Sequence, residues 1–230
     1  MTAALVVGCS VLGLVVGWFL DPVITRVPRK VPVFGPPADD EPPPSKLRQV
    51  LVTLVTGALF AAMAARFEDS WALPAYLVLT AALVALSVID LEHFLLPNRI
   101  VYPLTGAVLA LLGIAALADD NAESLTRGLL GGLVAFACFF VLHMVSPRSM
   151  GFGDVKLSFV LGLSLGYLGW GEVFVGLFLG FLYGAVIGII LIVVRARDRK
   201  QALPFGPFMA AGALTAILVG DAIITWYRGG

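Results

Sequence analysis

Charged residues are scarce in this chain. Only 13% of its 230 residues are Asp, Glu, Lys or Arg, whereas 60% are hydrophobic. Acidic and basic residues are equal in number, and no basic patch of the kind that binds nucleic acid is present. No polar segment is long enough to fold as a separate soluble domain, so the composition predicts one membrane domain over residues 1–230, with the lipid bilayer as its main surrounding.

Cysteine and histidine are also rare. Cys9 and Cys138 both fall within apolar runs and form no CxxC pair, which argues against a zinc ribbon or a thioredoxin-type site. His93 and His143 belong to no HExxH motif or other recognisable ligand spacing. The sequence therefore predicts no metal and no other cofactor.

Long apolar runs predict an all-α integral membrane bundle of about eight transmembrane helices. The expected helices cover residues 3–20, 47–65, 71–89, 100–118, 128–145, 156–169, 172–194 and 204–226. No positive residue precedes the first run and no clear cleavage site follows it, which indicates a retained helix and not a signal peptide. The sixth run is short, so it is expected to be tilted, partly re-entrant, or to begin earlier.

The positive residues predict the orientation in the membrane. Twelve of the fifteen Lys and Arg residues fall in the odd-numbered loops between these helices. Because basic loops stay cytoplasmic, both termini are expected to lie outside. Residues 21–46, which contain 31-VPVFGPPADDEPPP-44, are expected to form a proline-rich, extended cytoplasmic loop.

Two acids stand apart from the other loop carboxylates. Asp90 ends the apolar run 81-AALVALSVID-90, and Asp154 lies at the start of the sixth run. The helix order brings both to the cytoplasmic face, where an ionisable group is a candidate functional residue. Two neighbouring carboxylates do not both ionise easily, and such a pair suits aspartic proteolysis, in which one takes a proton from water while the other donates a hydrogen bond to the scissile carbonyl.

Glycines surround the second acid in 151-GFGDVK-156. Gly151 and Gly153 permit another backbone, such as an extended substrate, to come close. An alternative is that Asp154 is simply a helix cap, and the local motif leaves both interpretations open. Lys156 is expected either to stabilise the ionised site or to extend toward the membrane surface. Glu92 is expected either to act on Asp90 by like charge or to be solvated beyond the helix end.

Four segments together resemble the bacterial prepilin peptidases, the type IV leader peptidases, which are GxGD-type membrane aspartic proteases. The segments are 17-GWFLDPVITRVP-28, 89-IDLEHFLLPN-98, 151-GFGDVK-156 and 203-LPFGPFMAAG-212, and they occur in the family's order over nearly the whole chain. The resemblance implies that Asp90 and Asp154 are the catalytic pair, with Gly151, Gly153, Lys156 and Glu92 in support.

The same resemblance implies the substrates and the place of action. Family substrates are prepilins or pseudopilin-like precursors, whose leader is cut on the cytoplasmic side of the inner membrane, typically after a glycine that precedes the apolar pilin helix. Pilus or secretion assembly machinery is then a candidate partner. Pro204, Phe205, Gly206 and Pro207 are candidates for the substrate path, although this segment also suits a rigid helix start. Pro97, expected to break the chain, and Asn98, expected to cap the fourth helix, are further candidates.

One feature departs from larger family members. These carry a cytoplasmic insertion after the first helix, often with paired CxxC motifs, that is associated with N-methylation of the new N-terminus. Residues 21–46 occupy that place here and contain no cysteine. The expectation is therefore a peptidase without methyltransferase activity.

Two other functions remain open from the residues. A proton- or cation-coupled transporter would use the same carboxylates, but the apolar runs have almost no charge near their centres and no internal repeat is evident. A scaffold in a pilus-assembly machine with a degenerate site is disfavoured, because both aspartates and the flanking glycines are present.

Overall fold

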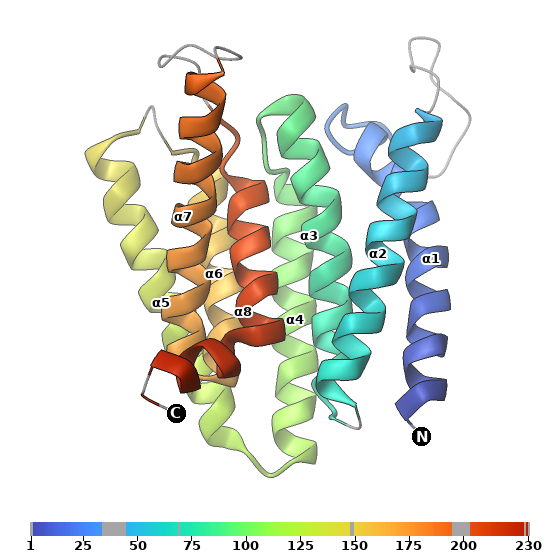
Figure 1. Ribbon diagram of the computed structural model, residues 1–230, viewed down its shortest axis with the longest axis vertical. Coiled ribbons are helices and arrows are strands. Elements are labelled where there is room, and N and C mark those ends of the chain that lie inside the picture. The colour runs from blue at the N-terminus through green and yellow to red at the C-terminus, as the bar shows by residue number, and fades with distance from the viewer. Residues whose placement is uncertain are drawn as a thin grey trace.

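The computed structural model describes residues 2–33, 45–68, 70–147, 150–194, 203–227 and 229. Within these ranges the chain forms eight helices that run up and down in a bundle (Figure 1). They are α1 (Thr2–Arg26), α2 (Lys46–Phe67), α3 (Leu73–His93), α4 (Asn98–Ala118), α5 (Ala122–Val145), α6 (Phe152–Leu168), α7 (Trp170–Val193) and α8 (Gly206–Tyr227). Seven of these described helices are long and apolar enough to cross a membrane, which confirms a polytopic all-α membrane protein.

The short sixth helix lies inside the bundle. α6 has 17 residues, most of which are buried, and it packs against α4, α5, α7 and α8. Because protein surrounds it, α6 does not need the length of a lipid-facing span. Of the alternatives for this short run, the earlier start is confirmed, since α6 begins at Phe152 and includes Asp154 in its first turn.

Small residues bring the helix backbones together. A Cβ atom added to Gly131 of α5 would lie 2.7 Å from the carbonyl oxygen of Gly162 in α6. A Cβ added to Gly212 of α8 would lie 2.6 Å from the carbonyl oxygen of Gly176 in α7. Without side chains at these points α5 contacts α6 and α7 contacts α8 at close range, as small residues permit in membrane bundles. These two pairs, with α1 and α2, are the most extensive helix contacts.

Two helices are longer than the apolar runs that predicted them. α1 continues from Leu20 to Arg26 through Pro22, which supplies no backbone N–H. The added turn is stabilised by the Thr25 hydroxyl, which donates to the carbonyl oxygen of Asp21 at 3.0 Å. α5 begins at Ala122 because the Asn121 side chain caps it, accepting from the backbone N–H of Ser124 at 3.1 Å.

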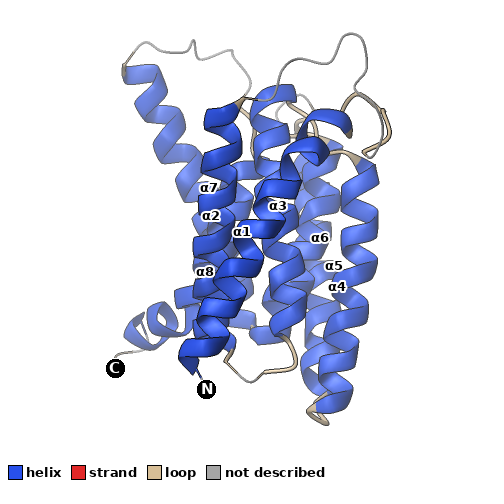
Figure 2. Ribbon diagram, turned by 90° about the vertical axis from the view of Figure 1, so that its right-hand side faces the viewer, coloured by secondary structure: helices blue, strands red, loops and turns tan. Residues whose placement is uncertain are grey.

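The bundle has two different ends. The last residues of α1, α3, α5 and α7 and the first residues of α2, α4, α6 and α8 lie at one end, and both chain termini lie at the other (Figures 1 and 2). The segments joined to the first end contain twelve of the fifteen Lys and Arg residues, so we call it the basic end. Asp90 and Asp154 both belong to it. The proline-rich residues 34–44 fall outside the described ranges.

Candidate active site

Asp90 lies in the last turn of α3 and is only 5% exposed. Its Oδ2 accepts a hydrogen bond of 2.9 Å from the backbone N–H of Gly206, the first residue of α8. The partial negative charge at the C-terminal end of α3 disfavours a carboxylate there. The N-terminus of α8, which has the opposite partial charge and a donor N–H, offsets that penalty.

The absence of a side chain at residue 206 makes this contact possible. A Cβ on Gly206 would stand 2.8 Å from Oδ2 of Asp90, closer than a carbon and an oxygen normally approach. Pro207 follows in the first turn of α8. A backbone N–H in this turn has no acceptor within the helix, so proline costs no helical hydrogen bond there. The Pro-Phe-Gly-Pro segment thus forms a rigid helix start whose N-terminal end is directed at Asp90. Its role in a substrate path stays a prediction.

Asp154 occupies the third position of α6 and is 7% exposed. Its Oδ2 accepts from the backbone N–H of Gly151 at 3.0 Å, and its own N–H donates to the carbonyl oxygen of Gly151 at 3.1 Å. Gly151 and not Asp154 occupies the N-cap position, so the alternative of Asp154 as the N-cap was wrong, although its side chain completes a capping box at the start of α6. Its negative charge also lies at the favourable end of the α6 dipole.

The two acids come together around Leu96, in the short connection between α3 and α4. A Cβ on Gly153 would lie 2.9 Å from Leu96 Cβ, and one on Gly206 would lie 3.3 Å from Leu96 Cδ2. Asp154 directly follows Gly153, and Asp90 is hydrogen-bonded to Gly206, so both acids lie next to Leu96. The bundle thus brings two mostly buried acids from α3 and α6 to one place, and the capping box that Asp154 completes does not exclude a chemical role.

Arg48 of α2 joins three helices beside this pair. Its Nη2 lies 2.8 Å from Oδ1 of Asp21 on α1, and its Nη1 lies 3.0 Å from Oε2 of Glu92 on α3. Nη2 also donates to the hydroxyl of Thr25 at 2.7 Å. Asp21 is buried, so this pair is screened little by solvent. Glu92, two residues after Asp90, is therefore paired with Arg48. The positive guanidinium of Arg48 compensates the negative charge of Glu92.

Lys156 connects the first turns of α6 and α4. Its ammonium group donates to Oδ1 of Asn98 at 2.9 Å and lies 5.1 Å from the ring centre of Tyr102 and 4.9 Å from that of Phe152. Both rings are within the range of cation–π attraction. Asn98 is the first residue of α4 and not its cap, because Pro97 occupies the cap position. Lys156 thus links the start of α4, which follows Asp90 in the chain, to the start of α6, which contains Asp154.

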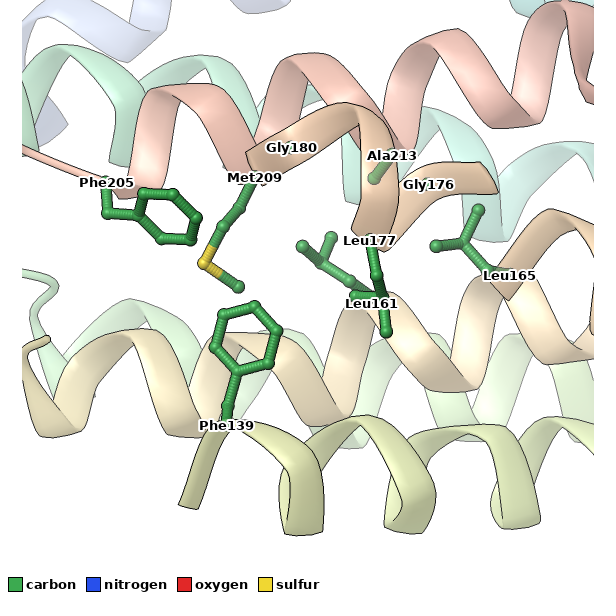
Figure 3. A pocket seen from close by; sticks show the side chains of 9 residues that line it. All are labelled: Phe139, Leu161, Leu165, Gly176, Leu177, Gly180, Phe205, Met209 and Ala213. Atoms are coloured by element: carbon green, nitrogen blue, oxygen red, sulfur yellow. The ribbon is translucent and has the colours of Figure 1, made fainter. Parts of the chain in front are cut away.

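Phe205 points into an apolar cluster between helices. Figure 3 shows its ring beside Met209 and facing Phe139 of α5. The ring centres of Phe205 and Phe181 are 5.1 Å apart, and those of Phe205 and Phe139 are 6.1 Å apart. The space among these side chains is too small for a water molecule. The ring therefore anchors the start of α8, and Pro204 before it is buried as well.

The histidines have local partners. His143 Nδ1 is 2.8 Å from the carbonyl oxygen of Met150, and His93 Nε2 is 3.9 Å from Oε2 of Glu92. Across the residues that the structure describes, no group of three or more His, Cys, Asp or Glu side chains is placed to hold a metal ion.

Sequence reasoning missed several residues of this region. Arg48 entered it only as a loop charge. Asp21 and Leu96 entered it only as members of the quoted segments 17–28 and 89–98, with no role of their own. The available signal was Asp21 and Thr25, which are four residues apart and share a helix face once α1 is extended past Pro22. Gly206 was noted for its motif, but its bond to Asp90 was not foreseen.

The fold and the acid pair define a polytopic membrane protein with a two-carboxylate site near one end of its helices. Residues 77–193 match the model of the Type IV leader peptidase family, and the chain belongs to that family. Proteins named prepilin leader peptidase/N-methyltransferase are similar to it. That of Aeromonas hydrophila is 36% identical over 188 residues, which cover 80% of this chain and 62% of the relative.

Two further relatives carry the same name. The protein of Pseudomonas aeruginosa is 34% identical, with 78% of this chain and 61% of the relative covered. That of Bacillus subtilis is 35% identical, with 76% and 67% covered. The match thus spans about three fifths of the first two of these three relatives. No solved structure matches the chain.

Replacing Arg48 with Met should destabilise the bundle, because the buried Asp21 would lose its cation. Breaking such a pair from one side costs about 3 kcal/mol, which thermal unfolding in detergent will detect as a lower Tm. Lys46→Met is the matched control, since it removes one exposed positive charge from the same turn of α2. Asp21→Asn should restore much of the loss in the double variant. An Arg48→Met protein as stable as Lys46→Met would contradict this role for the ion pair.

Proposed function

We propose that the protein is a membrane aspartic endopeptidase that removes the leader from type IV prepilin or pseudopilin-like precursors at the cytoplasmic face of the inner membrane. The observation that carries the proposal is the pair of mostly buried carboxylates, Asp90 of α3 and Asp154 of α6, which lie at the same end of the bundle on either side of Leu96. Membership of the leader peptidase family supports the same reaction. The names of the relatives point to prepilin substrates.

In the proposed mechanism the two carboxyl groups share one proton. The charged member takes a proton from a water molecule while the oxygen of that water attacks the carbonyl carbon of the scissile peptide bond. The protonated member donates a hydrogen bond to the carbonyl oxygen, which gains negative charge as the tetrahedral intermediate forms. Collapse of the intermediate re-forms the carbonyl and breaks the C–N bond, and the carboxyl group that took the proton from water gives it to the departing amine. Sharing makes the proton a property of the pair, so neither role is assigned to one residue.

The surroundings of the pair suit this chemistry. The N–H of Gly206 and the N–H of Gly151 each hold one carboxylate oxygen, which orients the two groups before any reaction. Lys156 and Arg48 fix the nearby helix ends through their contacts with Asn98 and with Asp21 and Glu92. The bias of Lys and Arg toward the basic end supports a cytoplasmic position for the site.

A coupled transporter is the competing proposal, and the arrangement of charges disfavours it. Such proteins place ionisable groups near the middle of the membrane, at the interface of structural repeats. Among the described residues, the buried acids are Asp21, Asp90, Asp154 and Glu172, and each lies near a helix end. A pair of acids at the basic end alone gives no route across the bundle.

We further propose that this chain does not methylate the new N-terminus. The segment between α1 and α2, where the methyltransferase-type insertion is expected, consists of residues 27–45 and contains no cysteine. The relatives are named as bifunctional proteins, so this proposal separates the chain from them in one of their two activities.

Asp90→Asn and Asp154→Asn should each abolish cleavage of a recombinant prepilin in liposomes. The amide cannot take a proton from water, so we expect the rate to fall by at least about a hundredfold. The fold should persist, because an Asn oxygen can accept the same backbone N–H. Cleavage is read as a change in precursor mass on a gel, and stability as the Tm of each variant.

Glu123→Gln is the control for this pair, since it removes an exposed carboxylate at the start of α5, far from the basic end. It should cleave like the wild type. Full processing by a folded Asp90→Asn or Asp154→Asn protein would overturn the peptidase proposal. Ion-dependent flux in the same liposomes without any cleavage would favour the transporter.

Mass spectrometry of the cleaved prepilin tests the second proposal. With S-adenosylmethionine present, the new N-terminus should keep the mass of an unmodified amine. A gain of one methyl group that depends on this chain and on S-adenosylmethionine would show that the activity does not require the insertion.

A further inference from the structure

A membrane-facing groove begins beside Asp90. It has a volume of about 280 Å³ and is lined by four residues from each of α2, α3 and α8. In Figure 1 α3 lies between α2 and α8, and α2 scarcely contacts α8, so the groove has α3 as its floor and the other two helices as its walls. Of its lining residues only Ser87 is polar.

The groove ends close to Asp90. Val88 of its floor precedes Asp90 by two residues, and Pro207 of its wall follows Gly206, which donates to Asp90. At 1.5 Å per residue, the lining residues of α3 extend from Asp90 about 10 Å toward the centre of the membrane. One end of the groove therefore lies near Asp90, and the rest extends along the apolar part of α3.

The lining favours a polypeptide segment as its occupant. Ser87, Ala210 and Ala211 are small, and small residues let a foreign backbone approach closely within a membrane. Val55 and Leu51 of the opposite wall are about half exposed and supply apolar contact area. An acyl chain of a lipid would form no hydrogen bond with Asp90 or with the N-terminus of α8, which lie near one end of the groove. A peptide bond placed there would meet both.

We propose that this groove binds the apolar segment of the substrate that directly follows the cleaved bond. The proposal rests on the proposed function, which places the scissile bond at Asp90 and Asp154. With the bond at the shallow end of the groove, the polar leader extends out of the membrane at the basic end. The first turns of the apolar segment then lie between α2 and α8. The groove selects precursors in which an apolar run begins immediately after the cut.

Ala211→Trp tests the groove, because residue 211 is exposed and its side chain would fill the space without entering the core. Val219→Trp is the matched control, placed on an exposed position of α8 outside the lining. In liposomes, Ala211→Trp should lower kcat/KM for a recombinant prepilin by about tenfold or more, as loss of a hydrophobic subsite does. Val219→Trp should stay within about twofold of the wild type. Equal values for the two folded variants would overturn the proposal.

Photo-cross-linking gives a second measurement that does not depend on cleavage. p-Benzoylphenylalanine replaces Ala211 or Val219 in an Asp154→Asn background, and the recombinant prepilin is added before irradiation. Residue 211 should form adducts with the apolar residues that follow the cleavage site, and residue 219 should not. Adducts of residue 211 with lipid or with a second copy of the chain, and none with prepilin, would contradict the proposal. Failure of the wild type to cleave prepilin would instead reject the proposed function.

Discussion

The hydrogen bond from Gly206 to Asp90 is the contact on which the site depends. It joins the C-terminal end of α3 to the N-terminal end of α8, two helix ends whose partial charges are opposite. A carboxylate at the end of α3 would otherwise be buried with an unfavourable dipole and little solvent. The start of α8 resolves this, but only because Gly206 has no side chain and Phe205 fixes the preceding backbone in an apolar cluster.

Asp154, the second acid, is positioned by a different interaction. Its side chain completes the capping box of the helix to which it belongs, so its position follows from the start of α6, and α6 is in turn fixed by close backbone contact with α5. Leu96 fills the space between the two acid-bearing segments, and Lys156 ties α6 to α4. The C-terminal end of α3 and the N-terminal ends of α6 and α8 thus meet in one small region. In this way a bundle of mostly apolar helices presents two oriented carboxylates.

The sequence predicted the helices and the acid pair because both depend on local or topological signals. Apolar runs mark spans, and an odd or even number of crossings decides which face Asp90 and Asp154 share. The contacts that complete the site have no such signal. Gly206 is 116 residues from Asp90, and Arg48 is 27 residues from Asp21 and 44 from Glu92. The apolar run left the start of α6 open between residue 156 and an earlier position, and the helix begins at Phe152, where the Asp154 side chain completes a capping box with Gly151.

The most direct test of this account is the kcat of Gly206→Ala on a recombinant prepilin in liposomes. A methyl group at residue 206 would displace Asp90, and a small displacement of a reacting group lowers a rate by about a hundredfold. Gly188→Ala in α7 is the reference, because a Cβ there would have no atom within 4 Å. We expect kcat to fall only in Gly206→Ala while both proteins remain folded at the assay temperature, with a lower Tm for Gly206→Ala because its methyl group crowds Asp90 and Leu96. Equal kcat values in two folded variants would contradict the central role of the α8 N-terminus.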